Sequence, residues 1–314
     1  MGAQKAGTTW LSDYVAEHPS CYMPPLKECH FFDVRSGADM QARRVATNSM
    51  KRMLEWLESA DGEGYTKALT NLQRAAERAE LYVPGDRGLK AYIKLMTERA
   101  EGATHLCDFT PSYSACDREV FEEMNSLSNN SKFIFIMRDP VERLWSQARM
   151  AGKRFTNRNK AAQFENASKR SLRHYIGRYA PADLPRSNYK RTIEELEAAL
   201  PNRQILYLFY ENLFTDASVK KFCDFVGIEY RPADFGAQSN VGRKMDIPPH
   251  IEKELRDGLA SQYDFVRDKF GDQVPETWFD AARDPEIVIE PEPAAANPKK
   301  GGKQRPVHAK NEGD

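Results

Sequence analysis

The segment of residues 132–137, which is apolar without interruption from Phe133 to Met137, constrains the fold of this chain more than any other feature, because it predicts a buried β-strand. A second run of the same kind covers residues 205–210. Strands with both faces covered, as in the centre of a parallel sheet, consist of nearly uninterrupted apolar residues. Because segments of helical periodicity alternate with these runs, we expect an α/β fold in which helices flank a parallel sheet.

Segments of helical periodicity surround the two predicted strands. We expect a short strand over 104–109, a charge-rich helical insertion over 40–102, and helices over 8–17, 141–150, 189–200 and 217–227. Basic residues are frequent between 153 and 191, and we expect a loop up to the helix that begins at Tyr189. From residue 284 onward Pro, Ala, Glu, Lys and Gly dominate without periodicity, which is typical of disorder. The predicted organisation is one domain over residues 1–283 and a disordered tail over 284–314.

The composition excludes several classes of protein. The 46 basic and 46 acidic residues balance, so no overall charge attracts nucleic acid or an anionic membrane, and any basic site must be local. The apolar runs are too short to span a bilayer. The five cysteines are irregularly spaced, which favours a reducing compartment over a disulfide framework, and no metal-ligand spacing is present. We therefore expect a soluble, cytoplasmic protein without a metal, unless an N-terminal segment is missing.

A glycine-containing loop at the start of the chain predicts an anion site. Two glycines lie five positions apart, a lysine lies between them, and paired threonines open a helix. Glycines let the backbone approach an anion closely, and the first N–H groups of a helix point toward it. The predicted binding residues are Gly2, Lys5, Ala6, Gly7, Thr8, Thr9 and Trp10. The alternative is a simple turn with Lys5 in solvent.

The strand at residues 132–137 is followed by a second candidate anion site. Arg138 comes directly after this strand, and Ser146 lies eight residues later in the predicted helix. The carboxyl ends of parallel strands are where α/β sheets bind ligands, and a guanidinium matches the geometry of a phosphate. The alternative is an ion pair between Arg138 and Asp139 with a structural role.

Together these two motifs resemble the sulfotransferases that use 3′-phosphoadenosine 5′-phosphosulfate (PAPS). The lysine precedes the second glycine, in the pattern KxGTTxL, whereas the ordinary phosphate loop, GxxxxGK[ST], places lysine after that glycine. The resemblance, which spans residues 1–270, implies that Lys5 meets the bridging oxygen of the donor and that Thr8 and Thr9 hold its 5′-phosphate. It also implies that Arg138 and Ser146 hold the 3′-phosphate.

A basic turn is the third element of this resemblance. Family members often close a basic, glycine-containing loop over the donor, and Gly242, Arg243 and Lys244 are the candidates here. A solvated surface turn is the alternative. The basic residues between 153 and 173 equally fit an acidic glycan or a solvated face.

The segment Lys27-Glu28-Cys29-His30-Phe31-Phe32-Asp33 resembles a segment of the heparan sulfate sulfotransferases in which glutamate is the catalytic base. This resemblance implies that Glu28 is the base and that Lys27 stabilises developing charge. His30 is the rival, because sulfotransferases acting on small phenols and alcohols use a histidine. A structural segment with a satisfied histidine is the third possibility.

Two departures from the family pattern bear on activity. Phe109 stands where the heparan enzymes have a lysine, which weakens the case for the same polysaccharide, while Asp108 could be an auxiliary acid, an acceptor ligand or a turn residue. The family's strand before the glycine loop is absent, since the chain begins at Met1, so we expect the loop to lose its anchor.

We therefore expect a P-loop-like fold without its first strand, and transfer of a sulfuryl group from PAPS to a hydroxyl acceptor of the carbohydrate class. The alternatives are a P-loop kinase or NTPase and a degenerate nucleotide-binding protein.

Overall fold

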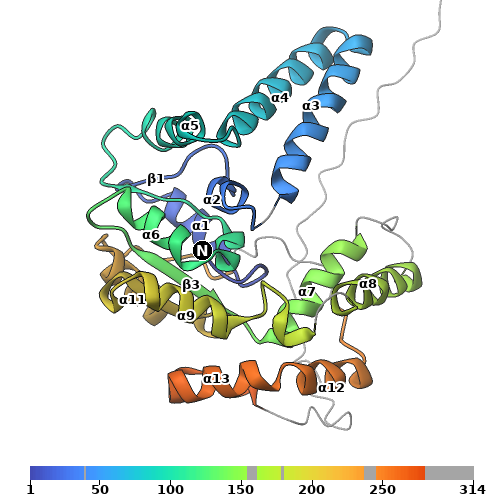
Figure 1. The fold of residues 1–314 in the computed structure, drawn as a ribbon, viewed down its shortest axis with the longest axis vertical. Helices are drawn as coiled ribbons and strands as arrows, with labels where there is room; N and C mark the ends of the chain where they lie inside the picture. Colours follow the sequence, from blue (N-terminus) through green and yellow to red (C-terminus); the bar gives the residue numbers. More distant parts are fainter. Residues whose placement is uncertain (39, 154–160, 178–179, 237–244, 280–314) are drawn as a thin grey trace, which may run out of the picture. The chain divides into compact units, whose positions relative to one another are not determined.

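The computed structural model describes residues 1–38, 40–153, 161–177, 180–236 and 245–279 (Figure 1). The chain divides into a compact unit, Met1–Trp278, and a second unit, Phe279–Asp314. All helices and strands described here belong to the first unit. In chain order they are α1 Thr8–Ala16, β1 Cys21–Tyr22, α2 Phe31–Arg35, α3 Gln41–Ser59, α4 Gly62–Leu81, α5 Asp86–Thr97, β2 His105–Leu106, α6 Arg118–Ser126, β3 Phe133–Met137, α7 Pro140–Lys153, α8 Ala161–Ile176, α9 Tyr189–Ala199, β4 Ile205–Phe209, α10 Tyr210–Leu213, α11 Asp216–Val226, α12 Pro249–Gly258 and α13 Ala260–Phe270.

The two predicted buried strands form the centre of the fold. β3 and β4 pair in parallel, with Phe133 opposite Ile205 and Met137 opposite Phe209. Four of the five residues of each strand are buried, as both faces of a covered parallel strand require. This arrangement confirms the expected α/β fold with a parallel sheet.

A second parallel pair consists of the very short strands β1 and β2. Within the described residues these two strands form a separate two-stranded sheet rather than an extension of β3 and β4. The segment before α1 adds one isolated parallel bridge between Gly2 and Ile136, in which the Ala3 N–H donates to the Ile136 carbonyl at 2.8 Å. The glycine loop is therefore attached to β3 by this bridge, which the sequence analysis did not foresee.

The helices predicted next to the strands are present. α1, α7, α9 and α11 correspond to the four expected helices, and each turns buried residues toward the core. α7 begins where Asp139 accepts hydrogen bonds from the N–H groups of Val141 and Glu142, at 2.9 and 3.0 Å. This cap satisfies N–H groups that the first turn of a helix leaves without a partner.

The prediction of a loop over residues 153–191 was wrong, because α8 occupies the middle of this segment. α8 packs along α7, as Figure 1 shows, and buries Phe164, Ala167 and Leu172. Gly152 allows this close approach, since a Cβ at that position would lie 2.5 Å from the Ser168 hydroxyl oxygen. The frequent basic side chains hid the apolar stripe of an amphipathic helix.

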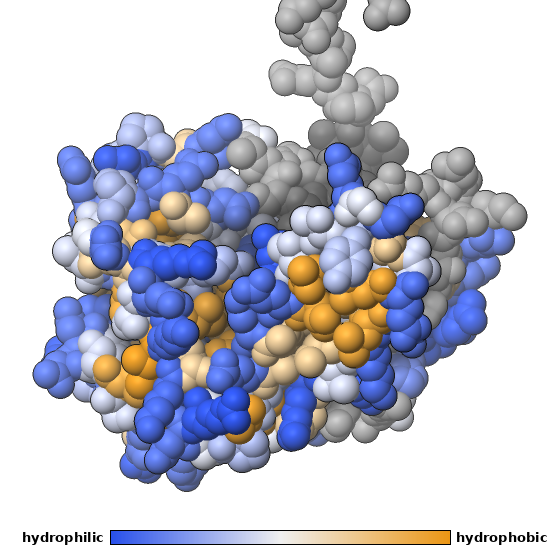
Figure 2. Space-filling view, turned by 90° about the horizontal axis from the view of Figure 1, so that it is seen from above, coloured by the Kyte–Doolittle hydropathy of each residue, from blue (hydrophilic) through white to orange (hydrophobic). Residues whose placement is uncertain are grey.

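The region of residues 40–102 contains α3, α4 and α5, and α3 lies alongside α4 (Figure 1). Several large apolar side chains in this region are exposed, among them Val45, Leu54 and Leu69. Figure 2 shows one face of the molecule, on which hydrophobic patches are separated by hydrophilic residues. Among the described residues, no helix is both long and apolar enough to cross a membrane.

Candidate functional site

The glycine loop has the backbone shape of an anion cradle. Lys5 and Gly7 both have positive φ angles, 76° and 77°, and Gly7 directly precedes the first residue of α1. A Cβ at Gly7 would lie 2.8 Å from the Leu213 side chain, so only glycine fits both the backbone and the space. Ala3 and Ala6 are fully buried. The buried alanines hold the loop in place. An anion bound in the loop would meet the N–H groups at the start of α1.

Positive charge is concentrated beside this loop. Burial lowers the pKa of Lys5, and the nearby guanidinium groups of Arg138 and Arg149 lower it further, while Glu28 raises it. Burial also lowers the pKa of Arg149, and the charge of Arg138 lowers it further. Cations repel one another when they converge, so an arrangement of this kind favours binding of a multiply charged anion.

Arg138 is held in place by three different contacts. It donates to the Lys5 carbonyl at 3.1 Å and to the Glu142 carboxylate at 3.3 Å, and its guanidinium lies 4.5 Å from the centre of the Tyr210 ring. Its own carbonyl accepts a hydrogen bond from Tyr189 at 2.7 Å. The end of β3 and the glycine loop are thus directly connected through the residue that the sequence assigns to a phosphate.

The other predicted donor residues take different positions. Ser146 is buried on α7, the same helix that carries Arg149. Thr8 is buried against Gly2, since a Cβ added at Gly2 would lie only 2.8 Å from the Thr8 methyl group. Thr9 is partly exposed at the start of α1. Trp10 is buried, and its indole N–H donates to the Asp234 carbonyl at 3.1 Å. The structure therefore places Trp10 in the core behind the loop.

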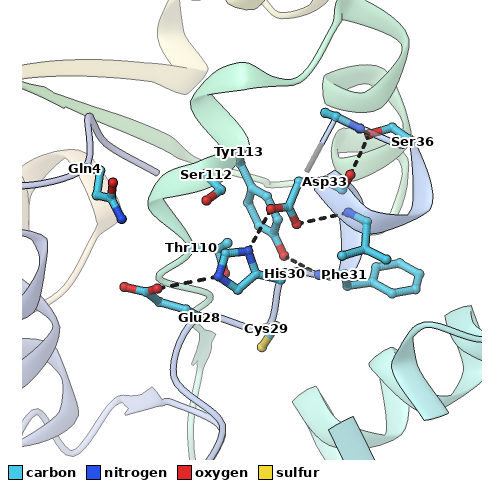
Figure 3. A network of polar contacts seen from close by, with 12 residues as sticks. Gln4, Glu28, Cys29, His30, Phe31, Asp33, Ser36, Thr110, Ser112 and Tyr113 are labelled. Carbon is cyan, nitrogen blue, oxygen red and sulfur yellow. Dashed lines mark hydrogen bonds and ion pairs between the residues drawn. The ribbon is translucent and has the colours of Figure 1, made fainter. Parts of the chain in front are cut away.

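A chain of charged groups leads from the core to the predicted catalytic base (Figure 3). Asp33 is fully buried and accepts a hydrogen bond from His30 Nδ1 at 2.7 Å. On the opposite side of the ring, His30 Nε2 lies 3.5 Å from the Glu28 carboxylate. The side chain of Glu28 is 42% exposed and that of His30 is 17% exposed, so Glu28 is the more accessible of the two groups.

This geometry sets opposite charges on the two candidate bases. The hydrogen bond from His30 lowers the pKa of Glu28, although burial partly opposes the effect. Burial acts against a charged His30, but its bonds to Asp33 and Glu28 outweigh that effect and raise its pKa to about 9. At neutral pH Glu28 is therefore an accepting carboxylate, whereas His30 is a protonated imidazolium.

The backbone around Glu28 adopts an uncommon conformation. Glu28 and His30 have positive φ angles of 56° and 53°, which residues with a Cβ rarely adopt. Between them, Cys29 is fully buried and its carbonyl accepts a hydrogen bond from Tyr82 at 3.0 Å. Lys27, the other predicted catalytic residue, is partly exposed, and its carbonyl accepts a hydrogen bond from Arg78 at 3.4 Å.

Asp108 accepts three hydroxyl hydrogen bonds beneath the site, from Tyr92 at 3.1 Å, Thr110 at 2.6 Å and Tyr113 at 2.8 Å. The Tyr113 hydroxyl in turn accepts from the Phe31 N–H at the start of α2. Of the roles considered for Asp108, these contacts favour a structural one, because they connect the Asp108–Tyr113 segment to the segment that contains Glu28.

Arg186 is a cation of the site that the sequence reasoning missed. It donates to the Gln4 side chain at 2.7 Å and to the Ser112 hydroxyl at 3.0 Å, and its charge contributes to the lowered pKa of Glu28. It comes from the stretch between α8 and α9, far from both partners in sequence. No local pattern around Arg186 signals this position, because only folding brings the three segments together.

Some predicted residues lie outside the described part of the chain. Gly242, Arg243 and Lys244 are among them, so the basic closing loop stays a prediction, as does the role of the basic residues 154–160. Within the described residues, no group of three or more His, Cys, Asp or Glu side chains is arranged to hold a metal ion.

Comparison with known proteins identifies the family. The profile of the sulfotransferase family matches residues 1–232. A sulfotransferase from Alicyclobacillus acidocaldarius is similar in structure, with a TM-score of 0.55 and 20% sequence identity over 89% of this chain and 96% of that one. The sulfotransferase domain of the Synechococcus PCC 7002 olefin synthase is more distant, with a TM-score of 0.47 and 18% identity over 83% of this chain and 92% of that domain. No curated protein matches in sequence. With a glycine loop, an arginine at the end of β3 and a family match over most of its length, this chain belongs to the sulfotransferase family.

Proposed function

We propose that this chain transfers a sulfuryl group from PAPS to a hydroxyl acceptor, with Glu28 as the catalytic base. One observation carries the proposal: a half-buried, ionised Glu28 is held beside a protonated His30, and its charge also acts on Lys5 in the glycine loop. A proton acceptor and a cation for the leaving group thus belong to the same site, as transfer to a hydroxyl requires.

In this mechanism Glu28 removes the proton of the acceptor hydroxyl. The acceptor oxygen then forms a bond to sulfur, while the bond between sulfur and the oxygen of the donor 5′-phosphate breaks. Lys5 neutralises the negative charge that grows on that phosphate, together with the N–H groups at the start of α1. Arg138 is assigned to the 3′-phosphate, and the proximity of Arg138 and Arg149 to Lys5 supports a role for both in binding the donor phosphates.

The charge states favour Glu28 over His30 as the base. A base must be unprotonated before the reaction, and a His30 pKa of about 9 leaves the imidazole protonated at neutral pH. His30 instead lowers the pKa of Glu28 and fixes its orientation. It acts through Glu28 and is a positioning residue.

We further propose that the acceptor is a carbohydrate. The segment from Lys27 to Asp33 supports this proposal, since it resembles the corresponding segment of the heparan sulfate enzymes. Phe109 stands where the heparan enzymes have a lysine, so one cation of the acceptor site is missing. Arg186 supplies another cation beside Ser112. We assign residues 1–283 to the transferase domain and 284–314 to a tail.

The test is transfer of label from ³⁵S-PAPS to a panel of glycans, phenols and lipids. We expect Glu28→Gln to reduce the turnover of the acceptor that is found by roughly 10²-fold or more, because the neutral amide cannot accept the proton. Calorimetry should show unchanged binding of 3′-phosphoadenosine 5′-phosphate, and the exposed Glu98→Gln should leave turnover unchanged.

Full activity of Glu28→Gln would rule out Glu28 as the catalytic base. Tighter binding of ATP–magnesium than of 3′-phosphoadenosine 5′-phosphate would overturn the proposal in favour of a kinase or NTPase.

A further inference from the structure

Arg186 connects the glycine loop to the part of the site that contains the base. Its Nη1 donates to the side-chain oxygen of Gln4 at 2.7 Å, and its Nη2 donates to the Ser112 hydroxyl at 3.0 Å. Gln4 directly precedes Lys5 in the loop. In Figure 3 the side chains of Gln4, Ser112 and Glu28 face the same region. The guanidinium that bonds to the first two is therefore a cation of the reaction centre.

The segment that carries Arg186 is anchored on both sides of the site. The next residue, Ser187, is fully buried, and its hydroxyl accepts a hydrogen bond from the buried Arg143 of α7 at 2.6 Å. Two residues further, Tyr189 donates to the Arg138 carbonyl at the end of β3, at 2.7 Å. α7 and β3 thus hold the backbone from which Arg186 reaches the loop, as precise positioning of a catalytic group requires.

The cations of the site act on different partners. Burial lowers the pKa of Lys5, and the charge of Arg138 lowers it further, so Arg138 lies near the lysine assigned to the leaving phosphate. The hydrogen bond from His30 lowers the pKa of Glu28, and the charge of Arg186 contributes to the same shift. The positive charge of Arg186 is therefore felt at the base.

Sulfuryl transfer needs positive charge in this place. In an in-line transfer the sulfuryl group lies between the leaving oxygen, which Lys5 neutralises, and the acceptor oxygen beside Glu28. The oxygens of the sulfuryl group carry negative charge, and the ionised carboxylate of Glu28 repels them, since like charges disfavour each other. A cation that acts on Glu28 and contacts the loop offsets this repulsion.

We propose that Arg186 binds the oxygens of the sulfuryl group as this group passes from the donor to the acceptor. The inference rests on the proposed sulfuryl transfer and adds a catalytic residue to it. A planar guanidinium fork suits a group with several charged oxygens. The acceptor oxygen forms a bond to sulfur, the bond from sulfur to the 5′-phosphate oxygen breaks, and the acceptor proton goes to Glu28. Arg186 stays protonated throughout.

The bond to Gln4 favours the sulfuryl group over the acceptor as the partner of Arg186. A residue that recognised only the acceptor would need no contact with the loop that holds the donor. Arg186 contacts that loop and acts on the base, and the sulfuryl group is the one part of the reactants that moves between these two places.

Comparison of two nucleotides isolates this contact, because 3′-phosphoadenosine 5′-phosphate lacks the sulfuryl group of PAPS. We expect Arg186→Gln to bind PAPS about tenfold or more weakly, as for lost hydrogen bonds to a charged group, and 3′-phosphoadenosine 5′-phosphate nearly as well as the native chain. Its turnover should fall about 10²-fold. Calorimetry measures both affinities. Arg87→Gln on α5, where the side chain is 72% exposed, is the matched control and should change neither.

An unchanged ratio of the two affinities in Arg186→Gln would overturn the inference, whatever happens to turnover. If both nucleotides bind equally weakly, Arg186 only supports the loop; if the KM of the acceptor alone rises, Arg186 recognises the acceptor. Arg186→Lys keeps the charge without the fork and serves if the glutamine variant does not fold. We expect a smaller fall in its ratio, and the native ratio would also overturn the inference.

The native chain separates this inference from the proposed function. If the native chain binds neither nucleotide and transfers no label, the proposed function fails and the role of Arg186 fails with it. If the native chain transfers label and Arg186→Gln keeps the native ratio of affinities, only the role of Arg186 fails.

Discussion

Glu28 and His30 are two residues apart, and both were candidates for the base on sequence alone. The decisive neighbour is Asp33, whose buried carboxylate accepts a hydrogen bond from His30 Nδ1. A buried carboxylate stabilises a protonated imidazole, and the imidazolium then stabilises the ionised form of Glu28. At neutral pH His30 is therefore protonated and Glu28 is ionised.

Replacing His30 should change the pH dependence of activity. His30→Gln removes the charge that lowers the Glu28 pKa, so this pKa rises and the acidic limb of the rate profile moves to higher pH. The variant should also lose an inflection near pH 9, where His30 of the native chain loses its proton. Rates of sulfuryl transfer measured from pH 4 to 10 check both shifts. An inactive variant at every pH would instead make His30 the base.

Arg138 should determine recognition of the 3′-phosphate. Without its guanidinium, Arg138→Ala should bind 3′-phosphoadenosine 5′-phosphate about 10- to 100-fold more weakly, which is typical of a lost charge-assisted hydrogen bond. Adenosine 5′-phosphate, which lacks the 3′ group, should lose much less affinity. Calorimetry with both ligands measures the ratio, with the exposed Arg118→Ala as control. An unchanged ratio would mean that another cation holds the 3′-phosphate.

At the scale of elements, the close packing of α7 and α8 supports the site. α7 carries Ser146 and Arg149, and α8 covers it where Gly152 meets Ser168. The contact involves backbone as well as side chain, since a Gly152 Cβ would also lie 2.9 Å from the Ser168 nitrogen. Backbone atoms cannot rotate away as a flexible side chain can, so the two helices would have to separate.

This packing predicts a penalty for Gly152→Ala. Although alanine favours a helix, we expect the variant to lower the free energy of unfolding by about 1–3 kcal/mol through overpacking. Gly64→Ala in α4 is the matched control. There the new Cβ would meet only the Ala60 Cβ, at 3.7 Å, so a gain of about 0.5–1 kcal/mol is expected. Urea denaturation measures both, and a stabilised Gly152→Ala would contradict the contact.

At the scale of the whole described unit, Asp139 connects the C-terminal helices to the end of β3. Besides capping α7, it accepts a hydrogen bond from Tyr263 of α13 at 3.0 Å and lies 3.7 Å from Arg256 of α12. Its N–H donates to Glu211 at the start of α10. The residue next to the phosphate-binding candidate Arg138 thus joins elements from distant parts of the chain.

Loss of the Tyr263 hydroxyl should therefore lower the stability of the whole unit. Tyr263→Phe removes a buried hydrogen bond to Asp139 and should lower the free energy of unfolding by about 1–3 kcal/mol. The exposed pair of Tyr230 and Asp216 offers a control, and Tyr230→Phe should be much less destabilising, because water can replace an exposed hydrogen bond. Both values come from urea denaturation followed by circular dichroism. Equal effects would show that Asp139 is not a structural junction.

Local sequence patterns were sufficient for most of the secondary structure near the site. The runs at residues 132–137 and 205–210 predicted β3 and β4, because a buried strand needs no polar alternation. The two-residue strand β2 lies within the strand predicted over 104–109. The α8 helix was missed because its exposed face is rich in charge, and β1, with two residues, is too short for periodicity to define.

The sequence by itself determined the loop from Gly2 to Thr9 and the arginine after β3, since glycine spacing and a strand-end position are local properties. Only the tertiary structure decided which of Glu28 and His30 can accept a proton at neutral pH, because the buried carboxylate of Asp33 and the desolvation of the ring depend on packing. It alone also brought Arg186 to Gln4 and Ser112. Long-range contacts of this kind leave no mark in local sequence, because each partner is an ordinary polar residue in its own segment.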